Sequence, residues 1–199
     1  MEIKKVNGVK KYLNKKGGIR MITTRMMSID DYKSVYELWV SIPGMGLNDI
    51  DDSFDGIKRY LERNPDTSFV AEDDGKIVGA ILAGHDGRRG FIYHAAVLHQ
   101  YRNRGIGKKL VDLALNALKQ KGISKVGLLV FSKNEIGNTF WEKMGFYEKE
   151  ACIYRDKKLR EMHYRPNPYL EKEQNIIYFQ ATEKVLEKDL ISTRMYKQG

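Results

Sequence analysis

The stretch from Tyr93 to Leu110 reads YHAAVLHQYRNRGIGKKL, and it decides what kind of fold the chain can adopt. A β-branched and aromatic run, Phe91 to Leu98, predicts a strand that ends in a polar turn containing Gly105 and Gly107. An amphipathic helix is predicted directly afterwards, from about residue 105 to residue 121. The first N–H groups of a helix have no intrahelical partner, and the helix dipole favours negative charge there. The stretch therefore predicts a site that grips a pyrophosphate.

The turn lacks two familiar phosphate-binding patterns. It contains neither G-x-G-x-x-G nor G-K-[ST], which excludes the dinucleotide fingerprint and the Walker loop. From Arg102 to Gly107 it does match the pattern [R/Q]-x-x-G-x-[G/A]. Taken alone, this pattern also has a simpler interpretation, in which the glycines shape a turn and the arginines form a solvated rim.

Three further blocks accompany the loop in a fixed order. Residues 69–79, FVAEDDGKIVG, predict a hairpin closed by an Asp-Gly turn. Residues 125–131 predict a buried strand, and residues 134–146, NEIGNTFWEKMGF, predict a helix followed by Gly145 and Phe146. Extended segments are expected near 146–157.

Together these four blocks resemble the GCN5-related N-acetyltransferases, the GNAT superfamily. The loop is similar to the family's acetyl-CoA loop, and residues 134–146 are similar to N-x-x-A-x-x-F-[Y/W]-x-x-x-G-F, with Gly137 in place of Ala. The resemblance covers roughly residues 21–158. It is closest to small bacterial members of the type that includes the ribosomal-protein alanine acetyltransferases.

The resemblance implies an α/β (α+β) fold with a mixed, mostly antiparallel central sheet flanked by helices, followed by a C-terminal extension. It implies that acetyl-CoA is the co-substrate and that its acetyl group moves directly to a primary amine of a small molecule or of a protein N-terminus. Backbone N–H groups of residues 103–108 are expected to hold the pyrophosphate, and the pantetheine arm is expected to pair with the strand before the loop. The residues expected to bind the co-substrate are Ala95, Ala96, Val97, Arg102, Asn103, Arg104, Gly105, Ile106, Gly107, Lys108, Asn134 and Trp141.

At the positions where related enzymes carry an acidic or basic residue that transfers protons, this chain has other residues. Where many members carry a tyrosine general acid the chain has Trp141, which is expected to pack on the pantetheine arm. Where other members carry a glutamate base it has Leu129 or Phe91. The catalytic candidates, chosen by proximity alone, are Glu72, Tyr93 and His94. For each of them a structural role is the alternative: a surface carboxylate, a core aromatic and a hydrogen-bonded sheet residue, respectively.

Composition sets outer limits on the function. The chain has 199 residues, of which 42% are hydrophobic and 31% charged, and this fits one soluble globular domain. The chain has neither an apolar run long enough to span a bilayer nor a secretory signal, so a cytoplasmic location is expected, without membrane association. Cys152 is the single cysteine, and its apolar, strand-like context predicts a buried thiol. The histidines lack metal-ligand spacing, so no metal is expected.

The two ends of the chain lie outside the family-like region. Residues 1–20 carry seven Lys or Arg and one Glu, a large share of the net charge of +9. They are interpreted as a flexible leader, or as sequence ahead of a start at Met21, although a basic arm can also bind nucleic acid or an anionic surface. The extension at 159–199 has no assigned role: it packs on the domain, mediates a homodimer or stays partly disordered.

The sequence is compatible with two other functions. The missing acid and base are compatible with a non-catalytic module that binds or senses acyl-CoA. A nucleic-acid-binding protein would use the basic arm, but the chain lacks the interleaved aromatic and basic residues of an RNA-binding sheet, so no nucleic-acid partner is expected.

Overall fold

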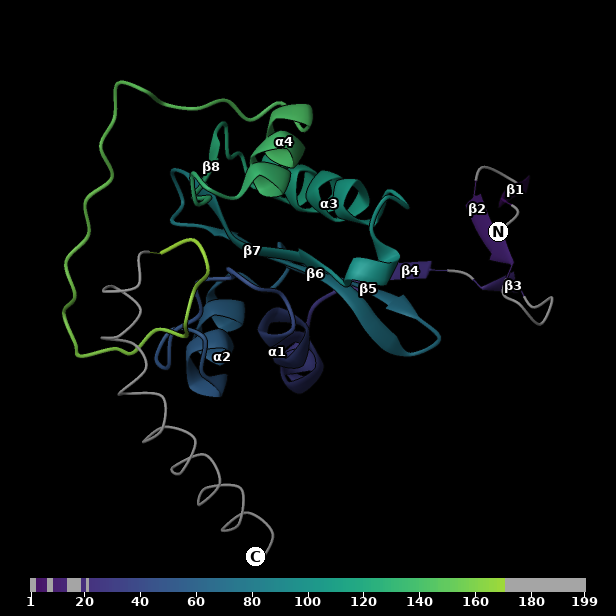
Figure 1. Cartoon of the computed structure of the whole chain (residues 1–199), viewed down its shortest axis with the longest axis horizontal. Coiled ribbons are helices and arrows are strands. Elements are labelled where there is room, and N and C mark those ends of the chain that lie inside the picture. Colours follow the sequence, from purple (N-terminus) through teal and green to yellow (C-terminus); the bar gives the residue numbers. More distant parts are fainter. Residues whose placement is uncertain (1–2, 7–8, 14–18, 21, 171–199) are drawn as a thin grey trace, which may run out of the picture. The chain divides into compact units, whose positions relative to one another are not determined.

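The computed structural model describes residues 3–6, 9–13, 19–20 and 22–170 (Figure 1). Contacts divide the chain into two compact units. The first consists of Tyr60–Leu128 and the described residues up to Ile42, and the second consists of Pro43–Arg59 and the described residues from Leu129 onward.

A five-stranded sheet forms the centre of the first unit. Its strands follow one another in the order β4 (Ile22–Met26), β5 (Phe69–Asp73), β6 (Lys76–His85), β7 (Gly90–Val97) and β8 (Val126–Leu128). The first four are antiparallel neighbours, and β8 runs parallel to β7. The predicted mixed, mostly antiparallel sheet is therefore confirmed. Central strand β6 is buried at nearly every position, which is why it reads as an almost continuous apolar run.

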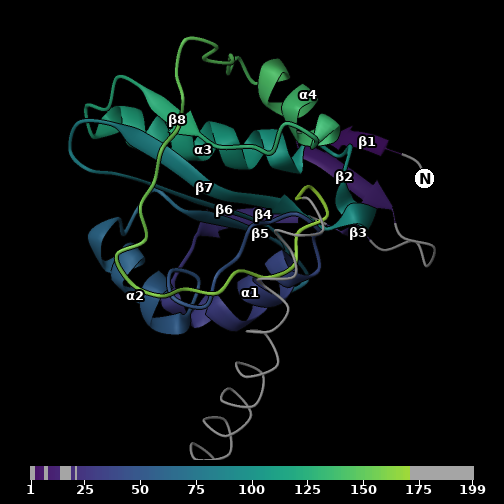
Figure 2. The ribbon, with the colours of Figure 1, turned by 60° about the vertical axis from the view of Figure 1, so that its left-hand side comes forward.

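Helices α1 (Tyr32–Val40) and α3 (Ile106–Gln120) cover opposite faces of this sheet (Figure 2). Each helix buries one stripe of apolar residues at helical spacing. The buried residues of the two stripes are Val35, Leu38, Trp39, Ile106, Leu110, Val111, Ala114 and Leu118. The predicted amphipathic helix after the basic loop is thus present.

A glycine lies at the β5–β6 turn and another at the end of α3, as the sequence predicts. In the β5–β6 hairpin, Asp74 and Gly75 both have positive φ, +55° and +74°, which a type I′ turn requires. At the end of α3, Gly122 has a φ of +78°, and the Ile123 N–H donates to the Leu118 carbonyl at 3.1 Å. This bond pattern closes the helix with a Schellman motif.

The second unit contains helix α4 (Glu135–Lys143) and the start of α2 (Phe54–Arg63), a helix that crosses the boundary between the units. The C-terminal segment joins the 47–49 stretch by main-chain contacts: Arg165 N–H donates to Leu47 at 2.8 Å, and Asn48 forms a β-bridge with Tyr164. The side chain of Asp49 accepts from the His163 N–H at 2.7 Å and lies 2.8 Å from its ring.

The segment after α3 departs from the sequence expectations. The strand expected over 125–131 is only the three residues of β8, and it ends where its β7 ladder ends, at Ile92. Residues 146–157 contain neither helix nor strand. The prediction of a buried Cys152 is wrong: this thiol is exposed, because its short apolar run lies in a charged stretch that enters no sheet.

The N-terminal residues, predicted to form a flexible leader, contain regular structure. Strands β1 (Ile3–Val6), β2 (Val9–Leu13) and β3 (Ile19–Arg20) form an antiparallel three-stranded sheet of their own. Met21, the predicted start of the domain, and residues 171–199 of the C-terminal extension lie outside the described residues. Among the helices in the described part of the chain, none is long and apolar enough to cross a membrane.

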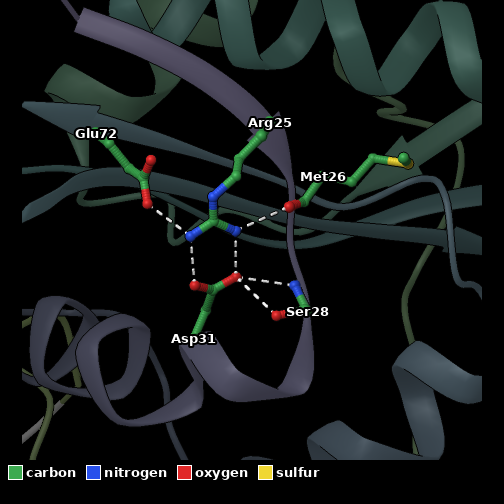
Figure 3. A network of polar contacts seen from close by, with 5 residues as sticks. All are labelled: Arg25, Met26, Ser28, Asp31 and Glu72. Carbon is green, nitrogen blue, oxygen red and sulfur yellow. Dashed lines mark hydrogen bonds and ion pairs between the residues drawn. The ribbon is translucent and has the colours of Figure 1, made fainter. Parts of the chain in front are cut away.

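Arg25 on β4 joins three parts of the first unit (Figure 3). Its guanidinium donates to both carboxylate oxygens of Asp31, at 2.7 and 2.6 Å, and to Glu72 on β5 at 2.6 Å. Burial alone would raise the pKa of Asp31, but the hydrogen bonds from Arg25 and from Ser28 outweigh it and lower that pKa. The network thus holds the start of α1 against β4 and β5.

We expect Arg25→Met to lower the free energy of unfolding at pH 7 by about 1–3 kcal/mol, because a nearly buried carboxylate loses its partner while Arg25 itself is partly solvated. Since the folded-state pKa of Asp31 is depressed, its stabilising contribution is present above the unfolded pKa of roughly 3.9 and is lost as the pH falls. The difference between the two proteins should therefore shrink below about pH 4.

Urea unfolding at pH 7 and at about pH 3 measures this difference. Lys121→Met is the matched control, because it breaks a more exposed ion pair, with Asp66 at 2.6 Å, and should cost at most about 1 kcal/mol. A difference between Arg25→Met and the parent that is equal at both pH values would contradict the role given to Asp31.

Candidate functional site

The edge of β7 changes partner halfway along the strand. β8 pairs with β7 at Gly90, Phe91 and Ile92, and its ladder stops there. On the other side, Leu82 pairs with His94 and Ala83 pairs with Ile92, so Tyr93 is an extra residue, a β-bulge. Bulges bend and twist a strand and re-aim its side chains. Within the described residues, no strand pairs with the β8 side of β7 from Ala95 to Val97.

The loop after β7 leads directly into α3. A short 3-10 turn, η2 (His99–Tyr101), follows the strand, and Asn103 and Gly105 have positive φ, +60° and +82°. The Lys109 N–H donates to the Gly105 carbonyl at 3.0 Å, so α-helical bonding begins at that pair. The preceding N–H groups are those that an α-helix leaves without an intrahelical acceptor. A Cβ on Gly105 would meet no atom within 4 Å, which shows that the space beside it is open.

Basic side chains surround this helix N-terminus. Arg102 Nε donates to the Val97 carbonyl at 3.2 Å, and Arg104 Nη2 donates to the Gln100 carbonyl at 2.7 Å. Lys108 in the first turn forms an exposed ion pair with Asp112 at 2.9 Å. Open N–H groups, a helix dipole and flanking cations together form an arrangement that can bind a diphosphate.

The three catalytic candidates lie in different surroundings. The Glu72 carboxylate is 2.6 Å from Arg25, so it already has a structural partner. His94 is 9% exposed, and its ring packs 4.8 Å from that of Trp39. Tyr93 is 57% exposed, and its ring meets the edge of Tyr60 at 5.5 Å. Of the three side chains, that of Tyr93 is the most exposed, and it lies on the same strand as Ala95–Val97.

The ring of Tyr60 packs edge-on against the ring of Tyr93, and the Tyr60 hydroxyl stays protonated. Burial, together with the neighbouring Tyr93, raises the pKa of Tyr60 well above its usual range. The two rings and that of Phe91, 4.9 Å from Tyr93, form an aromatic cluster at the bulge.

Asn134 and Trp141 belong to the second unit. Asn134 is the N-cap of α4, where its side-chain oxygen accepts from the Gly137 N–H at 3.0 Å. A Cβ at position 137 would lie 2.5 Å from the Asn134 side-chain nitrogen, so glycine fits where the family pattern has alanine. Trp141 packs against Phe140 and Phe146, with ring centroids 5.0 and 5.2 Å away. The predicted contacts of Asn134 and Trp141 with the co-substrate stay predictions.

Several residues at or near this site have partners that lie far away along the chain. Tyr101 binds Asp73, Arg25 binds Glu72, and Trp39 covers His94. These pairs are 28, 47 and 55 residues apart, and no spacing pattern in the sequence links them. In the part of the chain that the structure describes, His, Cys, Asp and Glu side chains form no group of three or more that could hold a metal ion.

Comparison with known proteins places this geometry in a family. The model of the acetyltransferase (GNAT) family matches residues 32–146. An acetyltransferase from Pectobacterium atrosepticum is 34% identical over 137 residues, which cover 69% of this chain and 95% of the relative. An acetyltransferase from Sodalis glossinidius is 32% identical over the same length and with the same coverage.

Solved structures share the fold. The aminoglycoside acetyltransferase AAC(6')-Iy, in complex with a CoA-containing bisubstrate analog, has a TM-score of 0.55 at 23% identity, with 69% of this chain and 98% of that chain covered. A ribosomal-protein-alanine N-acetyltransferase from Brucella melitensis has a TM-score of 0.53 at 21% identity, with coverages of 69% and 99%.

The chain belongs to the GNAT family of acetyltransferases. It is an N-acetyltransferase, and acetyl-CoA is its co-substrate.

Proposed function

We propose that the enzyme transfers the acetyl group directly from acetyl-CoA to a primary amine, on a small molecule or at a protein N-terminus. The observation that carries this proposal is that two features follow one another within the first unit. Residues Ala95–Val97 of β7, where no strand of the described residues pairs on the β8 side, are followed directly by the loop and the open N-terminus of α3. An extended arm ending in a diphosphate matches both features in order.

The co-substrate would be held along this path. Backbone N–H groups of 103–108 would bind the diphosphate, with Arg102, Arg104 and Lys108 supplying positive charge. The pantetheine arm would add to the β7 edge at Ala95–Val97 as a further strand does, through main-chain hydrogen bonds. The family pattern also assigns Asn134 and Trp141 to co-substrate binding, and we propose that role for them.

The reaction then needs no covalent enzyme intermediate. The amine nitrogen attacks the thioester carbon, the C–S bond breaks, and the thiolate leaves with its electron pair. A backbone N–H at the β7 edge would stabilise the thioester oxygen while it is negatively charged. One proton must leave the amine and one must reach the thiolate. Tyr93 is our candidate for the proton donor, because Glu72 is ion-paired and His94 is buried.

Two acceptor classes deserve the first trials. Among the structures that share the fold, one is named as an aminoglycoside acetyltransferase and another as a ribosomal-protein-alanine N-acetyltransferase. Both names denote amine acceptors, one a small molecule and one a polypeptide.

A screen of amines tests the proposal. Purified protein with acetyl-CoA is offered polyamines, aminoglycosides, amino acids and N-terminal peptides, and release of the CoA thiol is measured together with the acetylated product. We expect turnover with at least one primary amine and none with its N,N-dimethylated counterpart, which has no proton to lose after attack. Transfer to hydroxyl acceptors alone, or hydrolysis with no amine product, would contradict it.

A further inference from the structure

A hydrogen bond ties the basic loop to a distant strand. The Tyr101 hydroxyl donates to a carboxylate oxygen of Asp73 at 2.7 Å. Asp73 is the last residue of β5 and is only 6% exposed. Because the strand order is β5-β6-β7, this bond links the loop after β7 to a strand two positions away in the sheet. A hydrogen bond to a carboxylate is shorter and stronger than one between neutral groups.

The ring of the same tyrosine carries a cation. The guanidinium carbon of Arg104 lies 4.9 Å from the centre of the Tyr101 ring, and Arg104 also donates to the Gln100 carbonyl at 2.7 Å. Such a cation–π contact fixes the guanidinium over the ring face. Tyr101 thus connects a buried carboxylate on one side with a loop cation on the other.

The loop needs such support because of its backbone. Asn103 is a non-glycine residue at a φ of +60°, and none of residues 98–105, which connect β7 to α3, is buried. A loop held in this conformation before the ligand arrives loses less conformational entropy on binding.

We propose that Asp73 and Tyr101 are positioning residues for the diphosphate of acetyl-CoA: Asp73 fixes Tyr101, and Tyr101 fixes the loop and Arg104. Neither residue touches the reacting atoms. The inference rests on the proposed role of residues 103–108 as the diphosphate cradle. It predicts a defect confined to co-substrates that carry a diphosphate.

The test compares two acetyl donors, with an amine that the enzyme accepts. Acetyl-CoA contains the diphosphate, whereas S-acetylpantetheine ends before it. For Tyr101→Phe we expect KM for acetyl-CoA to rise roughly tenfold, equivalent to about 1.4 kcal/mol, with kcat unchanged. KM for S-acetylpantetheine should not change. Tyr101→Leu, which also removes the ring beneath Arg104, should raise KM for acetyl-CoA further.

Further variants distinguish a positioning role from a general effect on the stability of the protein. Asp73→Asn keeps an oxygen that can accept from Tyr101 and should retain a lower KM for acetyl-CoA than Asp73→Ala. Tyr147→Phe removes the hydroxyl of a tyrosine that is 71% exposed and should match the parent. Equal losses with both donors, a fall in kcat with unchanged KM, or no change with acetyl-CoA would overturn the positioning role.

The cradle itself is tested separately with Gly105→Glu. If that variant binds acetyl-CoA normally, the proposed cradle fails and the inference fails with it. If it loses binding while Tyr101→Phe retains the parental KM, only the positioning inference is wrong.

Discussion

Replacing Gly105 by glutamate should abolish measurable acetyl-CoA binding and leave the fold in place. Gly105 is the N-cap of α3, and its Cβ would project into open space beside the helix N-terminus. A carboxylate there would take the favourable position of the diphosphate and repel its negative charge. We expect affinity to fall by at least about a hundredfold, or roughly 2.7 kcal/mol.

A matched variant controls for the cost of the substitution itself. Gly87, in the β6–β7 turn, has a φ of +94° and also has no atom within 4 Å of its would-be Cβ. Gly87→Glu therefore carries the same added charge and a similar penalty of about 1–2 kcal/mol for a side chain in the left-handed region. Both variants should lose a similar amount of melting temperature without ligand.

Titration calorimetry and the thermal shift at millimolar acetyl-CoA distinguish the two variants, because a ligand that binds the folded state raises the melting temperature. Gly87→Glu should bind as the parent does, and Gly105→Glu should show neither heat nor shift. Normal binding by Gly105→Glu would mean that the diphosphate lies elsewhere.

Local chemistry explains which parts of the fold could be predicted from the sequence. The Asp74-Gly75 turn and the end of α3 at Gly122 depend on backbone preferences of the residues themselves. The amphipathic α3 depends on a regular apolar period. The prediction of a strand over 125–131 was too long. Apolar residues are typical of a strand along this whole range, but a strand extends only as far as its neighbour pairs with it, and β7 pairs with β8 over three residues. The same dependence on a partner explains the exposed Cys152.

Less of the candidate site than of the fold could be predicted, because many of its contacts join segments that are far apart in the sequence. The loop and the start of α3 are encoded in contiguous residues, so the sequence predicts Arg102 to Lys108 as candidate binding residues, and that role stays a prediction. The bulge at Tyr93 follows from the register between β6 and β7, which no single stretch contains. The partners of Glu72 and Tyr101 likewise depend on which strands become neighbours. Interactions between distant segments therefore distinguish Tyr93 from Glu72 and His94, and the sequence alone ranks them equally.

Helix α3 packs closely on the sheet at two glycines, Gly79 and Gly90. Replacing either glycine with a larger residue should have a large effect on stability. Below its N-terminal end, a Cβ on Gly79 would lie 3.2 Å from side-chain atoms of both Ile106 and Leu110. Below its C-terminal half, a Cβ on Gly90 would lie 3.2 Å from Leu118 and 3.0 Å from Val126. Valine at either position overfills a packed interface, so each variant should lose about 1–3 kcal/mol of stability.

Only one of the two variants should also lose affinity. Gly79 pairs with Val97, at the end of the proposed pantetheine edge, and lies under the first turn of α3. Gly79→Val should push that turn from the sheet and displace the N–H groups proposed to hold the diphosphate, so acetyl-CoA should bind roughly tenfold more weakly, about 1.4 kcal/mol. Gly90→Val displaces the far end of the same helix and should bind acetyl-CoA as the parent does. Urea unfolding and calorimetry on both proteins measure the two effects independently. Equal affinity losses would show that binding follows overall stability rather than the position of the helix N-terminus.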